Sequence, residues 1–117
     1  MNELARLRIE EHGEVAIARV GGELDISNAA GTGDAIAAEV PINARGLVVD
    51  FSELDFLDSS AISMLFGLAR RLSERRQRLH VVAPDGAAVT RVLDIVEFGR
   101  AAPMHGTLDA ALAAFDS

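Results

Sequence analysis

The stretch from Leu47 to Leu72 constrains the fold of this chain more than any other part of the sequence. It begins with an apolar run rich in β-branched residues, which is typical of a strand buried on both faces. It ends with apolar residues spaced three or four positions apart, a period that predicts a helix with one buried face. The residues expected on that face are Ile62, Leu65, Phe66, Ala69 and Leu72. The stretch therefore predicts a buried strand, a short link and an amphipathic helix.

The junction before this helix reads Asp58-Ser59-Ser60. Asp and Ser are favoured at helix starts because a side-chain oxygen can accept a hydrogen bond from an unpaired backbone N–H of the first turn. Two serine hydroxyls are therefore expected near the surface, at the electropositive end of a helix. From the pattern alone, capping explains both serines.

The remaining elements follow from periodicity and from turn residues. Two strands are expected between residues 4 and 20, around a turn at His12-Gly13, and Gly21-Gly22 should interrupt the second strand. A helix should follow over residues 28–40, ended by Pro41. The last third predicts a strand over 79–83, a helix over 89–96, an edge strand at 103–105 and a final helix over 107–115. A hairpin followed by alternating strands and helices predicts an α/β fold with a mixed β-sheet and helices packed against it.

The amino-acid composition excludes several classes of function. The 117 residues fit a single domain spanning 1–117, and 50% hydrophobic content is enough for one core. The net charge of −7 argues against direct binding to nucleic acid or to anionic membranes. The absence of Cys and Lys excludes thiolate metal sites, a P-loop and a Schiff-base lysine. No apolar run approaches the ~20 residues that cross a bilayer, and the start lacks a signal-peptide pattern, so we expect a cytoplasmic protein with no membrane insertion and no cofactor.

Three kinds of catalytic or metal site fit the sequence less well than simpler explanations. Four acidic residues precede the central helix, but their spacing matches no metal-binding loop, so no metal site is expected; they are Asp50, Glu53, Asp55 and Asp58. The serines lack the glycines of a nucleophile elbow, and ordinary surface roles are expected for His12, His80 and His105. A phospho-accepting receiver domain would open with alternating strands and helices and would use a lysine, unlike this chain. The chain is therefore not expected to be an enzyme.

Three short segments carry a resemblance to a known family. These are Asp50-Phe51-Ser52, the residues FLDSSAI at 56–62, and Gly22-Glu23-Leu24-Asp25. Together they resemble STAS domains, in particular the bacterial anti-sigma factor antagonists, and the order of elements agrees over nearly the whole length. The resemblance implies the STAS fold, with about four helices packed on the sheet. It also implies that Ser59 is phosphorylated by a partner that is both anti-sigma factor and serine kinase. Many phosphorylated members have Gly where this chain has Ala61, a change that leaves the hydroxyl in place.

The resemblance further implies where the partner binds and how binding is controlled. The unmodified form would bind the anti-sigma factor and release a sigma factor, phosphorylation of Ser59 would switch the protein off, and a phosphatase acting on phospho-Ser59 would reverse the change. The docking surface would include exposed positions of the central helix and Asp25, expected in a loop near the same end of the sheet. The predicted partner-binding residues are Asp25, Asp58, Ser60, Ser63, Met64, Gly67, Leu68 and Arg71, with Arg70 beside them. An alternative is a STAS binding subunit that does not switch, part of a stress-signalling assembly or of a lipid- or anion-transport complex.

Overall fold

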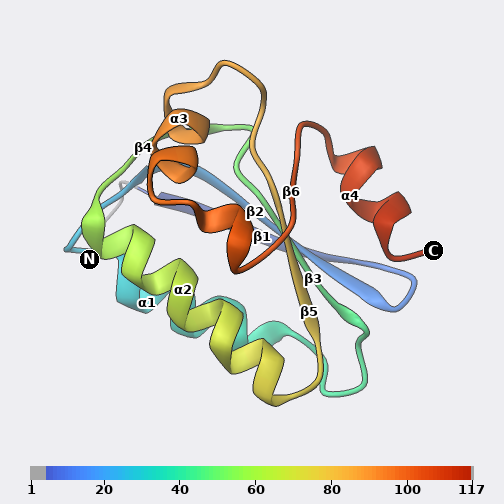
Figure 1. Cartoon of the computed structure of the whole chain (residues 1–117). Helices are drawn as coiled ribbons and strands as arrows, with labels where there is room; N and C mark the ends of the chain where they lie inside the picture. Colours follow the sequence, from blue (N-terminus) through green and yellow to red (C-terminus); the bar gives the residue numbers. More distant parts are fainter. Residues whose placement is uncertain (1–4, 117) are drawn as a thin grey trace.

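The protein is built on a twisted mixed β-sheet, seen in a computed structural model that describes residues 5–116. β1 (Ala5–His12) and β2 (Val15–Leu24) form the predicted antiparallel hairpin. β2 then pairs in parallel with β3 (Gly46–Asp50), which pairs in parallel with β5 (Arg78–Val82), and β5 pairs in parallel with β6 (Met104–His105). The order across the sheet is therefore β1-β2-β3-β5-β6 (Figure 1), and the prediction of a mixed sheet is confirmed.

One strand was not predicted, and one prediction about β2 is wrong. Gly21-Gly22 does not interrupt β2, which continues to Leu24 with a register shift after Gly22. From Gly22 to Leu24, on both sides of that shift, β2 pairs in parallel with β4 (Leu54–Leu57), inside the segment expected to be a simple link. β3 and β4 thus lie one after the other along the same side of β2. This pairing fixes the point at which the chain enters the central helix.

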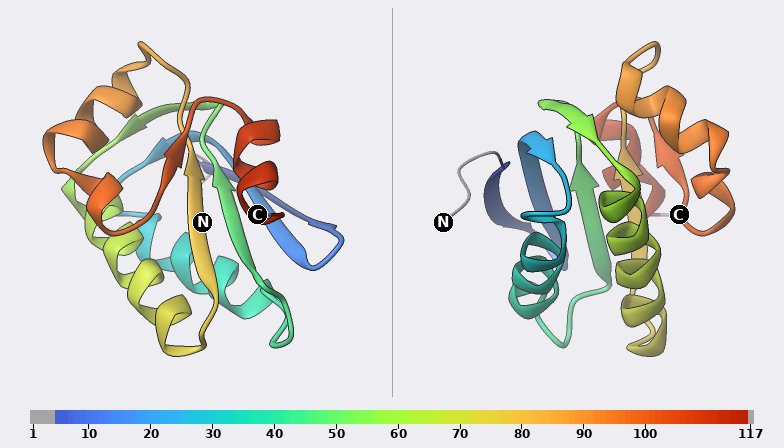
Figure 2. Two further views of the ribbon diagram at one scale, coloured as in Figure 1. Left: turned by 45° about the vertical axis from the view of Figure 1, so that its right-hand side comes forward. Right: turned by 90° about the vertical axis from the view of Figure 1, so that its left-hand side faces the viewer.

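The four predicted helices are present. α1 (Ala29–Glu39) and α2 (Ser59–Glu74) lie side by side on one face of the sheet, with α3 (Ala88–Ile95) beyond them near β4 (Figures 1 and 2). A short 3-10 turn, η1 (Phe98–Arg100), precedes β6. α4 (Leu108–Ala114) covers part of the opposite face. At the start of β2, Val15 and Ile17 pack with α4 on that second face, whereas Arg8 and Arg19 farther along the hairpin are partly exposed there.

Most of the core lies between the sheet and the three helices of the first face. All five residues of β3 are buried, as predicted for a central parallel strand. On α2 the fully buried residues are Ala61, Leu65, Leu68 and Leu72. Phe66 is 39% exposed, with its ring edge-on to Phe98 at a centroid distance of 5.0 Å. The predicted apolar face of α2 is therefore partly wrong: the core stripe runs through Leu68, and Phe66 lies at its margin.

A smaller cluster under α4 contains a buried histidine. His80 is 4% exposed, and its Nδ1 lies 2.9 Å from Nε2 of His105, with the two rings stacked. Its ring also packs against Phe115 of the C-terminal segment, at a centroid distance of 4.5 Å. Burial, and then the nearby His105 and Arg78, lower the pKa of His80. The expectation of an ordinary surface role is therefore wrong for His80, which holds the last segment against β5.

Candidate partner-binding site at the start of helix α2

The start of α2 is fixed by Asp58. Its Oδ1 accepts hydrogen bonds from the backbone N–H groups of Ser60, at 2.9 Å, and of Ala61, at 3.2 Å. These are two of the N–H groups that a helix leaves unpaired at its first turn. Asp58 is therefore the cap, and neither serine side chain supplies it. Capping does not account for the two serine hydroxyls that follow.

Ser59 occupies the first helical position and is exposed. Within residues 5–116 its hydroxyl has no hydrogen-bond partner, so it is free to react or to contact another molecule. The methyl group of Ala61, two residues on, is fully buried in the core. The departure from glycine at this position therefore adds no bulk to the surface around Ser59.

The structure brings Asp25 to the same place. Leu24 at the end of β2 pairs with Leu57 at the end of β4, so Asp25 and Asp58 follow neighbouring parallel strands. The backbone N–H of Asp58 donates to the carbonyl of Leu24 at 3.2 Å, which ties the two loops together. Asp25 is held by its own loop, because its Oδ1 accepts from the amide of Ser27 at 2.9 Å and its amide donates to Asn28 Oδ1 at 2.9 Å. The predicted position of Asp25 near the start of α2 is confirmed.

An open groove of about 510 Å³ runs between α1 and α2 from this end of the sheet. Gly33 on α1 is what lets the two helices come close, since a Cβ there would lie 2.5 Å from Cγ of Met64. Arg71 of α2 donates to Asp34 of α1 at 3.1 Å across the groove. The predicted partner-binding residues that line it are Ser60, Ser63, Met64, Gly67, Leu68, Arg70 and Arg71.

Two details of this surface differ from expectation. Leu68 is 1% exposed, because it belongs to the core stripe of α2, so it supports the groove floor and offers almost no contact area. Leu68 therefore has little surface of its own with which to contact a partner. Ile26, which the sequence reasoning missed, is 83% exposed beside the groove. The sequence did contain a signal for this exposed residue. Ile26 lies between two polar residues, Asp25 and Ser27, in the loop that joins β2 to α1, where an apolar side chain is not expected to reach the core.

The acidic residues before α2 are separated by the structure. Asp50 is 5% exposed and pairs with Arg19, while Asp58 caps α2. Among residues 5–116 no three His, Asp or Glu side chains gather in a way that could hold a metal ion. None of the helices in the described part of the chain is long and apolar enough to cross a membrane. What the site offers is an exposed hydroxyl, two neighbouring carboxylates and a groove with an apolar edge.

The STAS domain family model matches residues 6–111, and the chain belongs to the STAS domain family. Its relatives place it among the anti-sigma factor antagonists of that family.

Two relatives come from Mycobacterium tuberculosis. The anti-sigma-F factor antagonist RsfB is 32% identical over 89 residues, which cover 66% of this chain and 73% of RsfB. The anti-sigma-F factor antagonist RsfA is 31% identical over 108 residues, which cover 91% of this chain and 84% of RsfA. The crystal structure of an anti-sigma factor antagonist from Mycobacterium paratuberculosis superposes with a TM-score of 0.85 at 29% identity, covering 97% of this chain and 95% of that one.

Proposed function

We propose that this protein is a partner-switching antagonist that binds an anti-sigma factor, and so releases a sigma factor, only while Ser59 is unmodified. The observation that carries the proposal is the exposed hydroxyl of Ser59, which has no hydrogen-bond partner among the described residues and directly precedes Ser60 in the lining of the α1–α2 groove. The names of RsfA and RsfB supply the class of partner. The protein acts by binding and is not itself an enzyme.

The proposed docking surface is the groove together with the loop that precedes α1. Ile26 would supply an exposed apolar anchor, of the kind that dominates binding energy when a partner buries it. Ser63 and Arg70 are exposed along α2, and Asp25 lies beside the helix start. Polar groups around an apolar anchor give an interface its register and its specificity.

Phosphorylation of Ser59 would change this surface without unfolding it. A phosphate carries about −1.5 to −2 charges at neutral pH and three acceptor oxygens. The helix N-terminus attracts that charge, by roughly 0.3–1 kcal/mol at an exposed site, while the adjacent Asp58 repels it. The two effects oppose one another, so the fold should tolerate the phosphate. A partner that must cover Ser59 would have to desolvate a dianion next to two carboxylates, so its affinity should fall.

The proposed switch also requires one enzyme that adds the phosphate to Ser59 and another that removes it. The kinase is the anti-sigma factor itself, which reaches Ser59 in the complex, and a phosphatase restores the free hydroxyl. Both act in the cytoplasm, where sigma factors work. A STAS subunit that does not switch would use the same groove but would keep its affinity whatever the state of Ser59.

The assignment of Ser59 is tested by incubating the protein with its cognate anti-sigma factor and ATP, followed by peptide mass spectrometry. Phosphate is expected on Ser59, and Ser59→Ala should remain unlabelled while Ser60→Ala is labelled like the parent. Phosphate found on Ser60 alone, or full labelling of Ser59→Ala, would show that the switch is elsewhere.

The docking surface has a matched pair of exposed isoleucines for its test. Ile26 is 83% exposed beside the groove, and Ile42 is 91% exposed in the loop after α1. Ile26→Asp should weaken anti-sigma factor binding by ten-fold or more, whereas Ile42→Asp should leave it unchanged. Equal affinities for the two variants, each shown to be folded by circular dichroism, would mean that the surface has been misplaced.

A further inference from the structure

Three arginines gather on the open face of the hairpin, away from the α1–α2 groove. Arg8 on β1 is directly opposite Arg19 on β2, and Arg6 is opposite Gly21. Like charges directly opposite one another in an antiparallel pair destabilise the sheet. Negatively charged groups that lie close to such a cluster therefore stabilise it.

The protein's own carboxylates form ion pairs with two of the three arginines, Arg8 and Arg19. Arg19 donates through Nε to Glu10 at 3.0 Å and through Nη1 to Asp50 at 3.2 Å. Arg8 lies 3.4 Å from the same Glu10, so one carboxylate serves two arginines. Within residues 5–116 Arg6 has no carboxylate within 4.0 Å. The hydrogen bond from Arg19 lowers the pKa of Glu10, which therefore stays ionised and committed to this network.

Asp50 is equally committed. Besides Arg19, it accepts hydrogen bonds from the Ser52 amide at 2.9 Å and from the Ser52 hydroxyl at 2.6 Å. Asp50 is also only 5% exposed, so its carboxylate pairs with Arg19 from the interior of the protein and does not face the solvent. Guanidinium groups have five N–H donors, and within residues 5–116 most of those of Arg6 and Arg8 have no acceptor.

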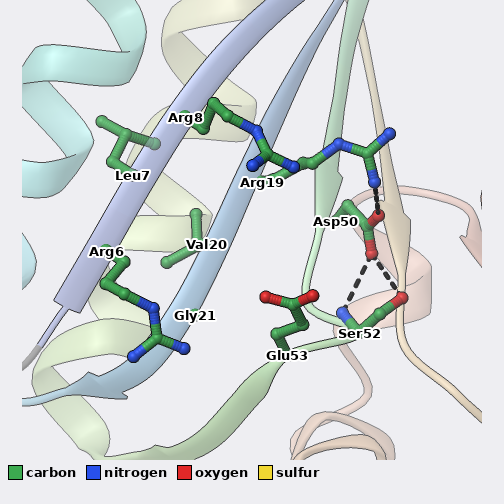
Figure 3. A pocket seen from close by; sticks show the side chains of 9 residues that line it. All are labelled: Arg6, Leu7, Arg8, Arg19, Val20, Gly21, Asp50, Ser52 and Glu53. Carbon is green, nitrogen blue, oxygen red and sulfur yellow. Dashed lines mark hydrogen bonds and ion pairs between the residues drawn. The ribbon is translucent and has the colours of Figure 1, made fainter.

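A pocket of about 150 Å³ lies among these side chains (Figure 3). The three arginines line it from β1 and β2, and Asp50, Ser52 and Glu53 line it from the end of β3. Gly21 forms part of the lining, and a Cβ at that position would lie 2.8 Å from Nη2 of Arg6. The missing side chain thus makes the room in which the Arg6 guanidinium lies over the sheet.

We propose that this pocket binds a small oxyanion, a single phosphate or carboxylate group, between Arg6 and Arg8. Guanidinium forks match the geometry of both groups and bind them through paired charge-assisted hydrogen bonds. Sites for drug-sized ligands usually have volumes of 300–1,000 Å³ or so. A pocket of about 150 Å³ therefore admits a compact anion or the anionic end of a small metabolite, and excludes a whole nucleotide.

Glu53 provides a test in which a substitution should strengthen anion binding instead of weakening it. It lines the pocket and has no ion-pair partner among the described residues, so its carboxylate faces the same space as Arg6. An ionised carboxylate at the rim weakens the binding of any anion. Removing its charge should therefore strengthen binding, an effect that nonspecific ionic screening would not produce.

The experiment is an NMR titration of the isotope-labelled protein with sodium phosphate and, separately, with sodium succinate, against sodium chloride at matched ionic strength. Saturable shifts are expected for the amides of residues 6–8, 19–21 and 52–53, with dissociation constants in the millimolar range. The titration that saturates first identifies phosphate or carboxylate as the preferred group. Shifts that never saturate, or that chloride reproduces, overturn the proposal.

Three variants and a control make the test specific. Arg6→Gln should weaken binding at least five-fold, and Glu53→Gln should tighten it two-fold or more. Gly21→Ala, whose new methyl displaces Arg6, should weaken binding as Arg6→Gln does. Arg91→Gln, on the exposed face of α3, removes the same charge elsewhere and should change nothing. Equal affinities for Arg6→Gln and Arg91→Gln would show that net charge, and not this pocket, controls the effect.

Discussion

The contact between Gly33 and Met64 makes a quantitative prediction about the α1–α2 groove. Replacing a helical glycine with alanine usually stabilises a protein by about 0.5–1 kcal/mol, because alanine restricts the unfolded chain. At Gly33 the new Cβ would lie 2.5 Å from Cγ of Met64, about 1 Å or more inside the usual carbon–carbon separation of about 3.5–4.0 Å. Overpacking of this kind costs about 1–3 kcal/mol, so Gly33→Ala should lower the free energy of unfolding by about 1 kcal/mol net.

Gly31 provides the matched control on the same helix. It is exposed, and a Cβ there would meet nothing within 4 Å. Gly31→Ala should therefore raise the free energy of unfolding by the full gain of about 0.5–1 kcal/mol that is expected for glycine-to-alanine in a helix. The two variants carry the same chemical change and differ only in what the methyl group meets.

Urea unfolding, followed by circular dichroism, measures both variants, and Met64→Ala completes a double-mutant cycle with Gly33→Ala. The clash should disappear when Met64 is truncated, so the two substitutions should couple favourably by about 1 kcal/mol or more. If Gly33→Ala stabilises the protein as much as Gly31→Ala does and shows no coupling to Met64→Ala, the close contact between the two helices is refuted. The groove would then have a different shape from the one described.

Three further predictions concern single residues. Asp58→Ala should lower the free energy of unfolding by about 0.5–2 kcal/mol through loss of the α2 cap, and Asp58→Asn, which keeps an accepting oxygen, should cost less, as denaturant melts can compare. Arg76 has φ +60 at the end of α2, so Arg76→Gly should raise the melting temperature by relieving a left-handed conformation that costs other residues about 1–2 kcal/mol. The unfolded chain takes up a proton at His80 below about pH 6.5, while burial keeps the folded ring neutral to lower pH, so the free energy of unfolding should fall as pH falls from 7 to 5.

Each of these has a result that would contradict it. Equal losses for Asp58→Ala and Asp58→Asn would assign the effect to charge rather than to capping. A lower melting temperature for Arg76→Gly would place the helix end elsewhere. His80→Gln should flatten the pH dependence relative to the parent, and His12→Gln, in the exposed hairpin, should not. If the unfolding free energy of His80→Gln depends on pH as strongly as that of the parent, a group other than His80 causes the dependence.

The sequence predicted the elements whose patterns are local. β3 reads as a buried strand because parallel central strands bury both faces, and Asp58 reads as a helix start because capping needs only neighbouring residues. Pro41 and Thr107 likewise marked a helix end and a helix start. The resemblance then assigned Ser59, Asp25 and the face of α2 near one another.

The features that could not be predicted depend on contacts between distant segments. Phe66 and Leu68 are both apolar, and the packing of α2 in the fold decides that Leu68 lies in the core while Phe66 meets Phe98 at its margin. β4 is four residues long and contains Asp55, so its pairing with β2 leaves no periodic signal. His80 is buried only because β6 and the C-terminal segment pack over β5. The arginine pocket arises from the register of β1 on β2, which the sequence of either strand does not contain.

If a phosphate on Ser59 switches the protein off, it should weaken partner binding and leave the fold intact. Titration calorimetry of the anti-sigma factor with the unmodified and the Ser59-phosphorylated protein measures this effect most directly, beside urea melts of the same two samples. Phosphorylation should weaken binding by ten-fold or more, equivalent to about 1.4 kcal/mol, and should shift the free energy of unfolding by less than about 1 kcal/mol. Equal affinities for the two forms, or a loss of binding that accompanies unfolding, would contradict the account.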